Sequence, residues 1–168
     1  MNPMKEYRPE LLSRKGELTA WITTALMIIG WLILVLTKKP VFPGIPFLAI
    51  FLLASALGIS LGNWMDRHTL IQIKSDGVHY QNGLRNTFLK WDEIQQIQVF
   101  PSNWGRKVRL VGSAAHFDFR TLGEVKVQGE IKGRMGFAEG EMILDQILEK
   151  ANLTLVTQNG NSYYYARE

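Results

Sequence analysis

The chain has 168 residues, of which 46% are hydrophobic, and it carries a formal net charge of +4 at pH 7. It contains no cysteine, which excludes disulfides, thiolate metal ligands and cysteine nucleophiles. We attribute part of the positive charge to membrane anchoring beside two apolar runs, rather than to nucleic-acid binding. The residues concerned are Lys5, Arg8, Arg14, Lys15, Lys38 and Lys39.

The two apolar runs cover residues 18–37 and 40–65, and neither contains a charged side chain. At about 1.5 Å rise per residue, the first run as a helix matches the ~30 Å hydrocarbon core of a bilayer. The second helix should begin just after Pro46, because proline is tolerated at helix starts and not inside helices. The sequence therefore predicts a transmembrane hairpin at 18–65, preceded by a cytoplasmic segment at 1–17.

A cleaved signal peptide is the competing interpretation of the first run. It is disfavoured because the run is longer than a signal core of ~7–15 residues and has no small-x-small cleavage pattern. Basic residues are more numerous at the outer ends of the hairpin than in its turn, which predicts cytoplasmic N- and C-termini. Those at the outer ends are Lys5, Arg8, Arg14, Lys15, Arg67 and Lys74, and those in the turn are Lys38 and Lys39.

Two features of the hairpin suggest how it meets lipid and other helices. Trp21 and Trp64 lie near its outer ends, where indole rings can sit at headgroup depth as interface anchors. Ala54, Gly58 and Gly62 recur every four residues, so they share one helix face that another backbone can approach closely. This face would serve either packing inside the hairpin or contact between two copies in a homodimer.

After the hairpin the pattern changes to the period-two alternation of strands. A turn at Asp76-Gly77 predicts a strand hairpin in which Lys74 pairs with His79. Strands are also expected at 87–91 and 94–100.

A turn at Gly112-Ser113 predicts the next strand hairpin. In this register Leu110 lies opposite Ala115, Val108 opposite Phe117, Lys107 opposite Asp118, and Arg109 opposite His116.

The last third of the chain is predicted to hold a loop, a helix and a hairpin. Residues 122–136 are rich in glycine and are expected to form an irregular loop, with at most a short strand near 125–131. Residues 139–152 carry an apolar stripe at three- and four-residue steps, with acidic residues first and Lys150 last, which favours a helix. Residues 153–168 are expected to form a C-terminal hairpin or tail around Asn159-Gly160.

Residues 66–152 show a resemblance to a known family. It rests on the order of strands followed by one amphipathic helix and on the stretches 73–84 and 89–97. These residues resemble the bacterial pleckstrin-homology-like (PH-like) domains that are attached to one or two membrane helices. The resemblance implies a partly open antiparallel barrel capped by a C-terminal helix, in a protein of the bacterial inner membrane. It also implies a binding or assembly module without catalytic residues, which would hold a protein partner or an anionic lipid surface.

The two-helix hairpin followed by a small β-rich domain is also similar in layout to the photosystem I assembly factor. This similarity implies an alternative function, as an assembly factor or accessory subunit of a membrane complex with the hairpin as the specific contact. It would place the chain in a thylakoid if the host is photosynthetic.

The candidate binding residues are the basic side chains Arg106, Lys107, Arg109 and Arg120. They would form a patch for anionic lipid or a partner, and the alternative is a solvated strand face partly neutralised by Asp118. The phosphoinositide site of eukaryotic PH domains does not carry over, because the turn at 74–77 has one lysine and the next strand has no arginine.

Catalytic, metal and nucleotide sites are not expected. His116 and Asp118 share a strand face near Ser113, but the ~7 Å between such neighbours exceeds the reach of a catalytic triad. His68 and His79 have no ligand spacing, and the glycines at 129–140 lack the Gly-Lys-Ser/Thr ending of a phosphate loop. We therefore expect no enzyme activity and no cofactor.

Overall fold

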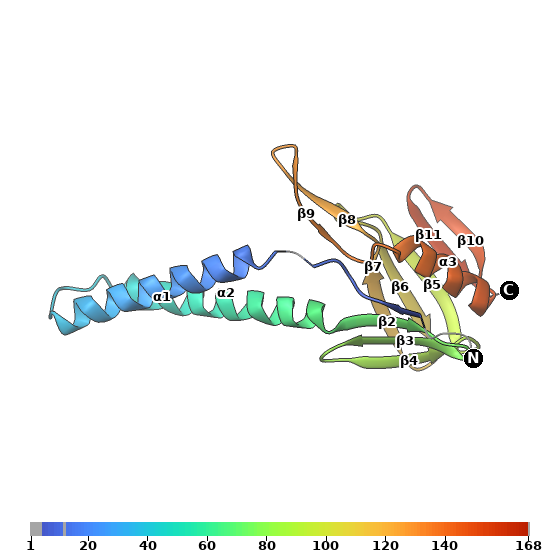
Figure 1. The fold of residues 1–168 in the computed structure, drawn as a ribbon, viewed down its shortest axis with the longest axis horizontal. Coiled ribbons are helices and arrows are strands. Elements are labelled where there is room, and N and C mark those ends of the chain that lie inside the picture. The colour runs from blue at the N-terminus through green and yellow to red at the C-terminus, as the bar shows by residue number, and fades with distance from the viewer. Residues whose placement is uncertain (1–4, 12, 168) are drawn as a thin grey trace. The chain divides into compact units, whose positions relative to one another are not determined.

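The computed structural model describes residues 5–11 and 13–167 of the chain. A short strand comes first, two long helices follow, and the rest is built from antiparallel strands and one further helix (Figure 1). This confirms the expected order of two apolar helices, a β-rich region and a C-terminal helix.

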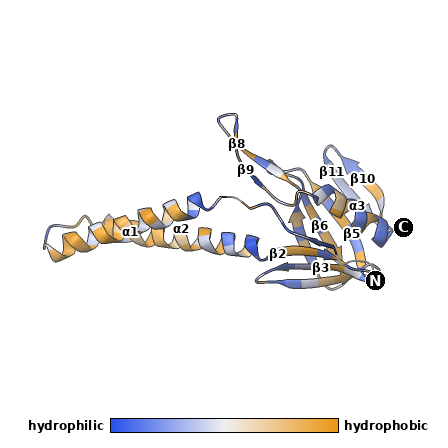
Figure 2. Cartoon of the chain, viewed as in Figure 1, coloured by the Kyte–Doolittle hydropathy of each residue, from blue (hydrophilic) through white to orange (hydrophobic). Residues whose placement is uncertain are grey.

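The two long helices are α1 (Lys15–Leu36) and α2 (Gly44–Arg67), and both are long and apolar enough to cross a membrane (Figure 2). Helix α2 begins before Pro46, not after it as predicted. Proline fits there because the N–H groups of a first helical turn have no intrahelical acceptor. The buried side chains of the two helices are small, which lets backbones approach closely: Thr24, Ala49 and Ala56.

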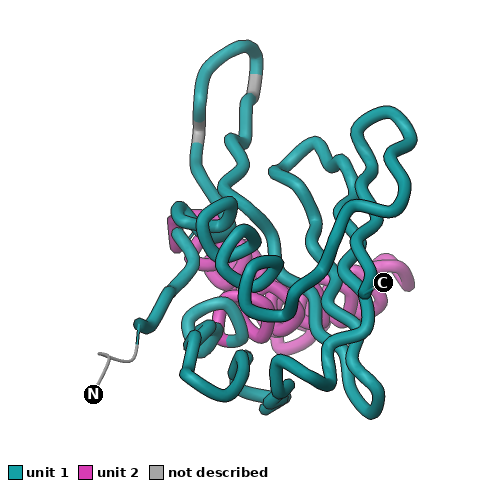
Figure 3. The backbone as a smooth tube through the Cα atoms, turned by 90° about the vertical axis from the view of Figure 1, so that its right-hand side faces the viewer, with its two compact units in different colours: residues 1–12, 65–168 teal, residues 13–64 magenta. Residues whose placement is uncertain are grey.

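The chain divides into two compact units (Figure 3). Residues 13–64 form one unit, and the described residues before and after them form the other, which we call the β unit. The β unit therefore contains chain from both sides of the hairpin.

The β unit has two main antiparallel sheets, a separate two-stranded hairpin and one helix. The first sheet has the order β1 (Lys5–Tyr7), β2 (Thr69–Ile73), β3 (Gly77–Asn82), β4 (Asn86–Lys90). The second has the order β10 (Thr154–Asn159), β11 (Ser162–Ala166), β5 (Ile94–Phe100), β6 (Lys107–Gly112), β7 (His116–Arg120). The hairpin is β8 (Gly123–Val127) with β9 (Glu130–Met135), and the helix is α3 (Gly140–Ala151). In the described part of the chain no ladder joins the two main sheets, so they do not close into a barrel.

One hydrophobic core is shared by the two sheets and α3. Tyr80 of β3 stacks on Phe117 of β7, with ring centroids 4.8 Å apart and planes 6° apart. The stripe predicted for the helix is buried, as Ile143 and Ile147 are fully enclosed. Asn152 adopts the left-handed conformation that ends the helix. Burial of the alternate strand residues and of this stripe is what holds the β unit together.

Both predicted hairpin registers are wrong by two residues. Between β2 and β3, Ile73 lies opposite Val78 and the Lys74 amide donates to the Gly77 carbonyl, so Lys74 does not pair with His79. A shift of two residues keeps every side chain on its predicted face, because the strand repeat is also two.

Between β6 and β7 the same kind of shift occurs. The observed partners are Leu110 with Phe117, Val108 with Phe119, Lys107 with Arg120, and Arg109 with Asp118.

The two glycines that suggested those turns serve close packing instead. A Cβ on Gly77 would lie 2.3 Å from the carbonyl oxygen of Leu89, and one on Gly112 would lie 2.7 Å from the Leu89 side chain. Neither glycine has a positive φ. A glycine in the sequence can be required by the backbone conformation of a turn or by the close approach of a neighbouring strand, and the sequence alone does not distinguish the two.

The segment predicted as an irregular loop at 122–136 is mostly the hairpin β8–β9. Gln128 and Gly129 form its turn with φ values of 53° and 83°, the pair of positive values that a two-residue turn needs to match the strand twist. Glycine made this segment look irregular, yet it is what permits the tight turn.

Candidate functional site

The strands β5, β6, β7 and β11 present one continuous face away from the core, which we call the outer sheet face. Its side chains are Gln96, Gln98, Phe100, Lys107, Arg109, Val111, His116, Asp118, Arg120 and Tyr164. Cross-strand register places them in rows, of which the most charged are Phe100–Lys107–Arg120 and Gln98–Arg109–Asp118. Three of the four predicted basic residues therefore come together here.

Asp118 is the charge partner of two of these residues. Arg109 donates to both of its carboxylate oxygens at 2.9 and 3.2 Å, and Lys107 lies 2.8 Å from it. Partial burial alone would raise the pKa of the Asp118 carboxyl, but hydrogen bonds from Arg109 and Lys107 outweigh burial and lower it. The Asp118 carboxylate also raises the pKa of the Arg109 guanidinium. The pairing matches the alternative interpretation, a strand face partly neutralised by Asp118.

Arg120 and Arg106 differ in their surroundings. Arg120 donates to the hydroxyl of Ser102 at 3.3 Å and remains on the outer sheet face. Arg106 pairs instead with Glu141 of α3, and its guanidinium lies 5.9 Å from the Tyr163 ring centroid. The expectation of one four-residue patch is therefore wrong for Arg106, which stands next to Lys107 in sequence and so faces the other side of the sheet.

His116 and Asp118 share a face of β7 as expected, and the Asp118 carboxylate is engaged by Arg109 and Lys107. Within residues 5–11 and 13–167, no three His, Asp or Glu side chains gather as metal ligands. His79 lies on the other sheet, where its ring nitrogens contact the side-chain oxygens of Gln72 and Asn86.

In the hairpin, the indole N–H of Trp21 donates to the Ser60 hydroxyl at 2.8 Å, and Trp64 is exposed. Ala54, Gly58 and Gly62 are all exposed, and a Cβ on either glycine would have no neighbour within 4 Å. This face therefore does not pack against α1, and it leaves room for a helix from another chain.

The N-terminal segment is part of the β unit, which the sequence analysis did not predict. Strand β1 pairs with β2, Tyr7 is only 3% exposed, and the Glu10 amide donates to the Gly136 carbonyl at 2.7 Å. A three-residue strand is too short for a periodic pattern, and Tyr7 among charged residues was the one available hint. The chain before the hairpin is thus folded together with the chain after it.

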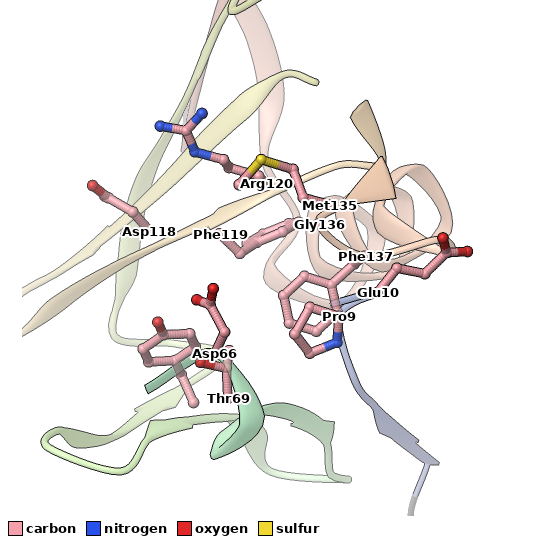
Figure 4. A pocket seen from close by; sticks show the side chains of 11 residues that line it. Pro9, Glu10, Asp66, Thr69, Asp118, Phe119, Arg120, Met135, Gly136 and Phe137 are labelled. Carbon is pink, nitrogen blue, oxygen red and sulfur yellow. The ribbon is translucent and has the colours of Figure 1, made fainter. Parts of the chain in front are cut away.

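A cavity of about 180 Å³ lies within the β unit, and we call it the edge cavity. The end of α2, strands β2, β3 and β7, and residues 9–10 and 135–137 converge around it (Figure 4). Its lining residues are Pro9, Glu10, Asp66, Thr69, Tyr80, Asp118, Phe119, Arg120, Met135, Gly136 and Phe137. Sequence reasoning missed it, because its parts come from segments far apart in the chain.

The environment of the edge cavity is aromatic and negative. Phe119 and Phe137 meet edge to face with ring centroids 5.9 Å apart. Burial raises the pKa of the Tyr80 phenol, and the negative charges of Asp118 and Asp66 add to the rise. A hydrogen bond with Asn82 and the positive charge of Arg85 oppose it without cancelling it. The Asp66 carboxylate points into the cavity, while the side chains of Glu10 and Arg120 point away from it (Figure 4).

No protein-family model, curated protein sequence or solved structure shows significant similarity to this chain.

Proposed function

We propose that this chain is an integral membrane protein that presents a non-catalytic, PH-like binding module on the cytoplasmic side of a bacterial inner membrane. The observation that carries the proposal is the pairing of β1 with β2, since β1 precedes the first apolar helix and β2 follows the second. Because one small unit holds both ends of the hairpin, both ends must leave the membrane on the same side. The excess of basic residues at those ends favours the cytoplasmic side.

The PH-like assignment is supported by the order of elements. Strands β2, β3 and β4 form consecutive antiparallel pairs in one sheet, β5, β6 and β7 do so in the other, and a helix follows. Strands β1, β10 and β11 extend the two sheets at their edges. The hairpin β8–β9 is an insertion between the last of these strands and the helix.

The outer sheet face is the proposed binding surface, and an acidic surface of a partner protein is the proposed ligand. Lys107, Arg109 and Arg120 outnumber the single carboxylate of Asp118 there. Phe100 is 39% exposed beside Lys107, and arginine with exposed aromatic rings is the composition that protein interfaces favour. Ion pairing with Asp118 also holds Arg109 in one orientation, which lowers the entropy cost of binding.

Photo-crosslinking in native membranes tests this proposal. A photoreactive residue at Gln98, beside Arg109, should give a discrete protein adduct that the double change Arg109→Glu, Arg120→Glu abolishes. The same residue at Gln81, on the other sheet, is the matched control and should give none. If the adducts form with anionic lipid alone, the ligand of the outer sheet face is a lipid surface and not a partner protein. Equal adducts at both positions, or none at Gln98, would contradict a binding role for this face.

A second candidate function is that of an assembly factor or accessory subunit of a membrane complex. It is favoured by the exposed small-residue face of α2, where Gly58 and Gly62 have open space beside them. Replacing residues 13–64 by an unrelated two-helix anchor separates the two functions. Retention of the Gln98 adduct supports the β unit as the binding element, and loss of the adduct supports the hairpin.

A further inference from the structure

The edge cavity is lined by aromatic rings and by a carboxylate that has no charge partner among the described residues. In the described part of the chain, the Asp66 carboxylate receives no hydrogen bond and forms no ion pair, although it points into the cavity (Figure 4). The Asp118 carboxylate at the rim is engaged by Lys107 and Arg109. Asp66 lines the cavity and is exposed to solvent, so a cation from outside can reach it.

The rest of the lining fits a small cation better than an anion. Tyr80, Phe119 and Phe137 line the same cavity as the carboxylate. Aromatic rings attract cations through their negative faces. The one basic side chain of the lining, Arg120, points away and donates to Ser102. A volume of about 180 Å³ is below the ~300 Å³ at which ordinary small-molecule pockets begin, so it suits a headgroup-sized ligand.

The position of Asp66 in the chain suggests where such a cation comes from. Asp66 follows Trp64 by two residues in the last turns of α2, which corresponds to about 3 Å along the helix axis. If α2 spans the bilayer, as the proposed function requires, Asp66 is at headgroup depth. The abundant small cations at that depth are the ammonium groups of zwitterionic lipids. A primary ammonium can donate hydrogen bonds to Asp66, whereas a quaternary ammonium cannot.

We propose that the edge cavity binds the primary ammonium group of a phosphatidylethanolamine headgroup, with Asp66 as its charge partner and Tyr80, Phe119 and Phe137 as its aromatic wall. This inference rests on the proposed function, since it needs α2 in a bilayer. Binding would fix the β unit at the membrane surface through Asp66 and the aromatic wall, whereas Lys107 and Arg109 of the outer sheet face do not line the cavity.

Lipid retention by the full-length protein tests the inference. The protein is purified in mild detergent, exposed to equal amounts of phosphatidylethanolamine, phosphatidylcholine and phosphatidylglycerol with the same acyl chains, and examined by native mass spectrometry. The wild type should retain phosphatidylethanolamine about tenfold over the other two, the effect of one charge-assisted hydrogen bond. Asp66→Asn should remove this preference, and Asp76→Asn, in the exposed turn before β3, should keep it.

Variants of the aromatic wall and soluble headgroup analogues test the site further. Phe119→Leu retains the carboxylate but removes one ring, so it should give an intermediate preference. If Asp66→Asn does not fold, soluble glycerophosphoethanolamine should displace the lipid from the wild type, and glycerophosphocholine should not. Equal retention of all three lipids, an unchanged preference in Asp66→Asn, or binding of a lysine-containing peptide in place of lipid would overturn the inference. Alkaline extraction of membranes that contain the protein distinguishes failure of the proposed function from failure of this inference. Release of the protein by alkali would contradict the proposed function. A protein that stays in the membrane but shows no lipid preference would contradict this inference alone.

Discussion

The phenolic hydroxyl of Tyr7 donates a hydrogen bond to Oε1 of Gln146 on α3, across 3.2 Å. Tyr7 precedes the first apolar helix and Gln146 belongs to the last helix of the chain. Together with the β1–β2 ladder, this contact makes the N-terminal segment a structural part of the β unit.

Truncating Tyr7 should therefore destabilise the β unit, although Tyr7 precedes the hairpin and lies outside the domain predicted at residues 66–152. Tyr7→Phe should lose about 1 kcal/mol through the lost hydrogen bond, and Tyr7→Ala about 3 kcal/mol through the lost ring. Unfolding of the full-length protein in detergent, followed by near-UV circular dichroism, measures both. Arg8→Ala is the control, because Arg8 is exposed and pairs with Glu6, two residues away on the same segment. Equal effects of Tyr7→Ala and Arg8→Ala would show that the segment is not docked.

Gly77→Ala should destabilise the β unit more than Gly112→Ala. A Cβ on Gly77 would meet backbone at 2.3 Å, whereas the nearest atom to one on Gly112 is a side-chain methyl of Leu89 at 2.7 Å. Overpacking of this kind costs about 1–3 kcal/mol, and Gly77→Ala should lie at the upper end. Thermal unfolding midpoints rank the variants. Gly30→Ala in α1, where a Cβ has open space, should not lower the midpoint. The reverse order of Gly77 and Gly112 would contradict the packing role.

Acid should remove the stabilisation that Asp118 provides. Its pKa is lowered in the folded protein from an unfolded value near 3.8, because the hydrogen bonds from Arg109 and Lys107 outweigh burial. A lowered pKa gives a contribution that is complete above the unfolded pKa and is lost as the pH falls through the folded pKa. The wild type should therefore lose more stability than Asp118→Asn between pH 5 and pH 3. Denaturant midpoints across this range measure the difference, and parallel curves would mean that the ion pairs do not persist in solution.

The tryptophans of the hairpin should report their depths in a bilayer. Trp21 and Trp64 lie near the outer ends of the apolar runs, whereas Trp31 lies further inside the first run. In vesicles, Trp21→Phe with Trp64→Phe should reduce fluorescence quenching by lipids brominated close to the glycerol. Trp31→Phe should instead reduce quenching by lipids brominated near the bilayer centre. The opposite pattern would show that the first two are not interface anchors.

The lack of native cysteine makes topology directly measurable. Lys39→Cys, in the turn of the hairpin, should react with a membrane-impermeant maleimide added to intact bacterial cells. Arg85→Cys, between β3 and β4, should react only in inverted membrane vesicles. Labelling of both positions from the same side would contradict a hairpin that crosses the membrane twice.

Hydrophobic periodicity in the sequence predicts most of the secondary structure. The apolar runs gave two helices, the alternation from residue 69 gave strands, and the stripe through Ile143 and Ile147 gave α3 with its buried face. The strand at 94–100 has the bounds that the sequence predicted. These patterns are local, because each follows from how a single helix or strand divides its side chains between apolar surroundings and water.

Only the tertiary structure decided which elements meet. It assigned β1 to the edge of β2, moved Arg106 away from Lys107 and Arg109, and set both hairpin registers two residues from the predicted ones. It also brought Asp66, Phe119 and Phe137 together around one cavity. Such contacts depend on close packing between segments far apart in the chain, as the approach of Gly77 to the Leu89 backbone illustrates. A hydrophobic pattern records which face of an element is buried, but it does not record the neighbour against which that face is buried.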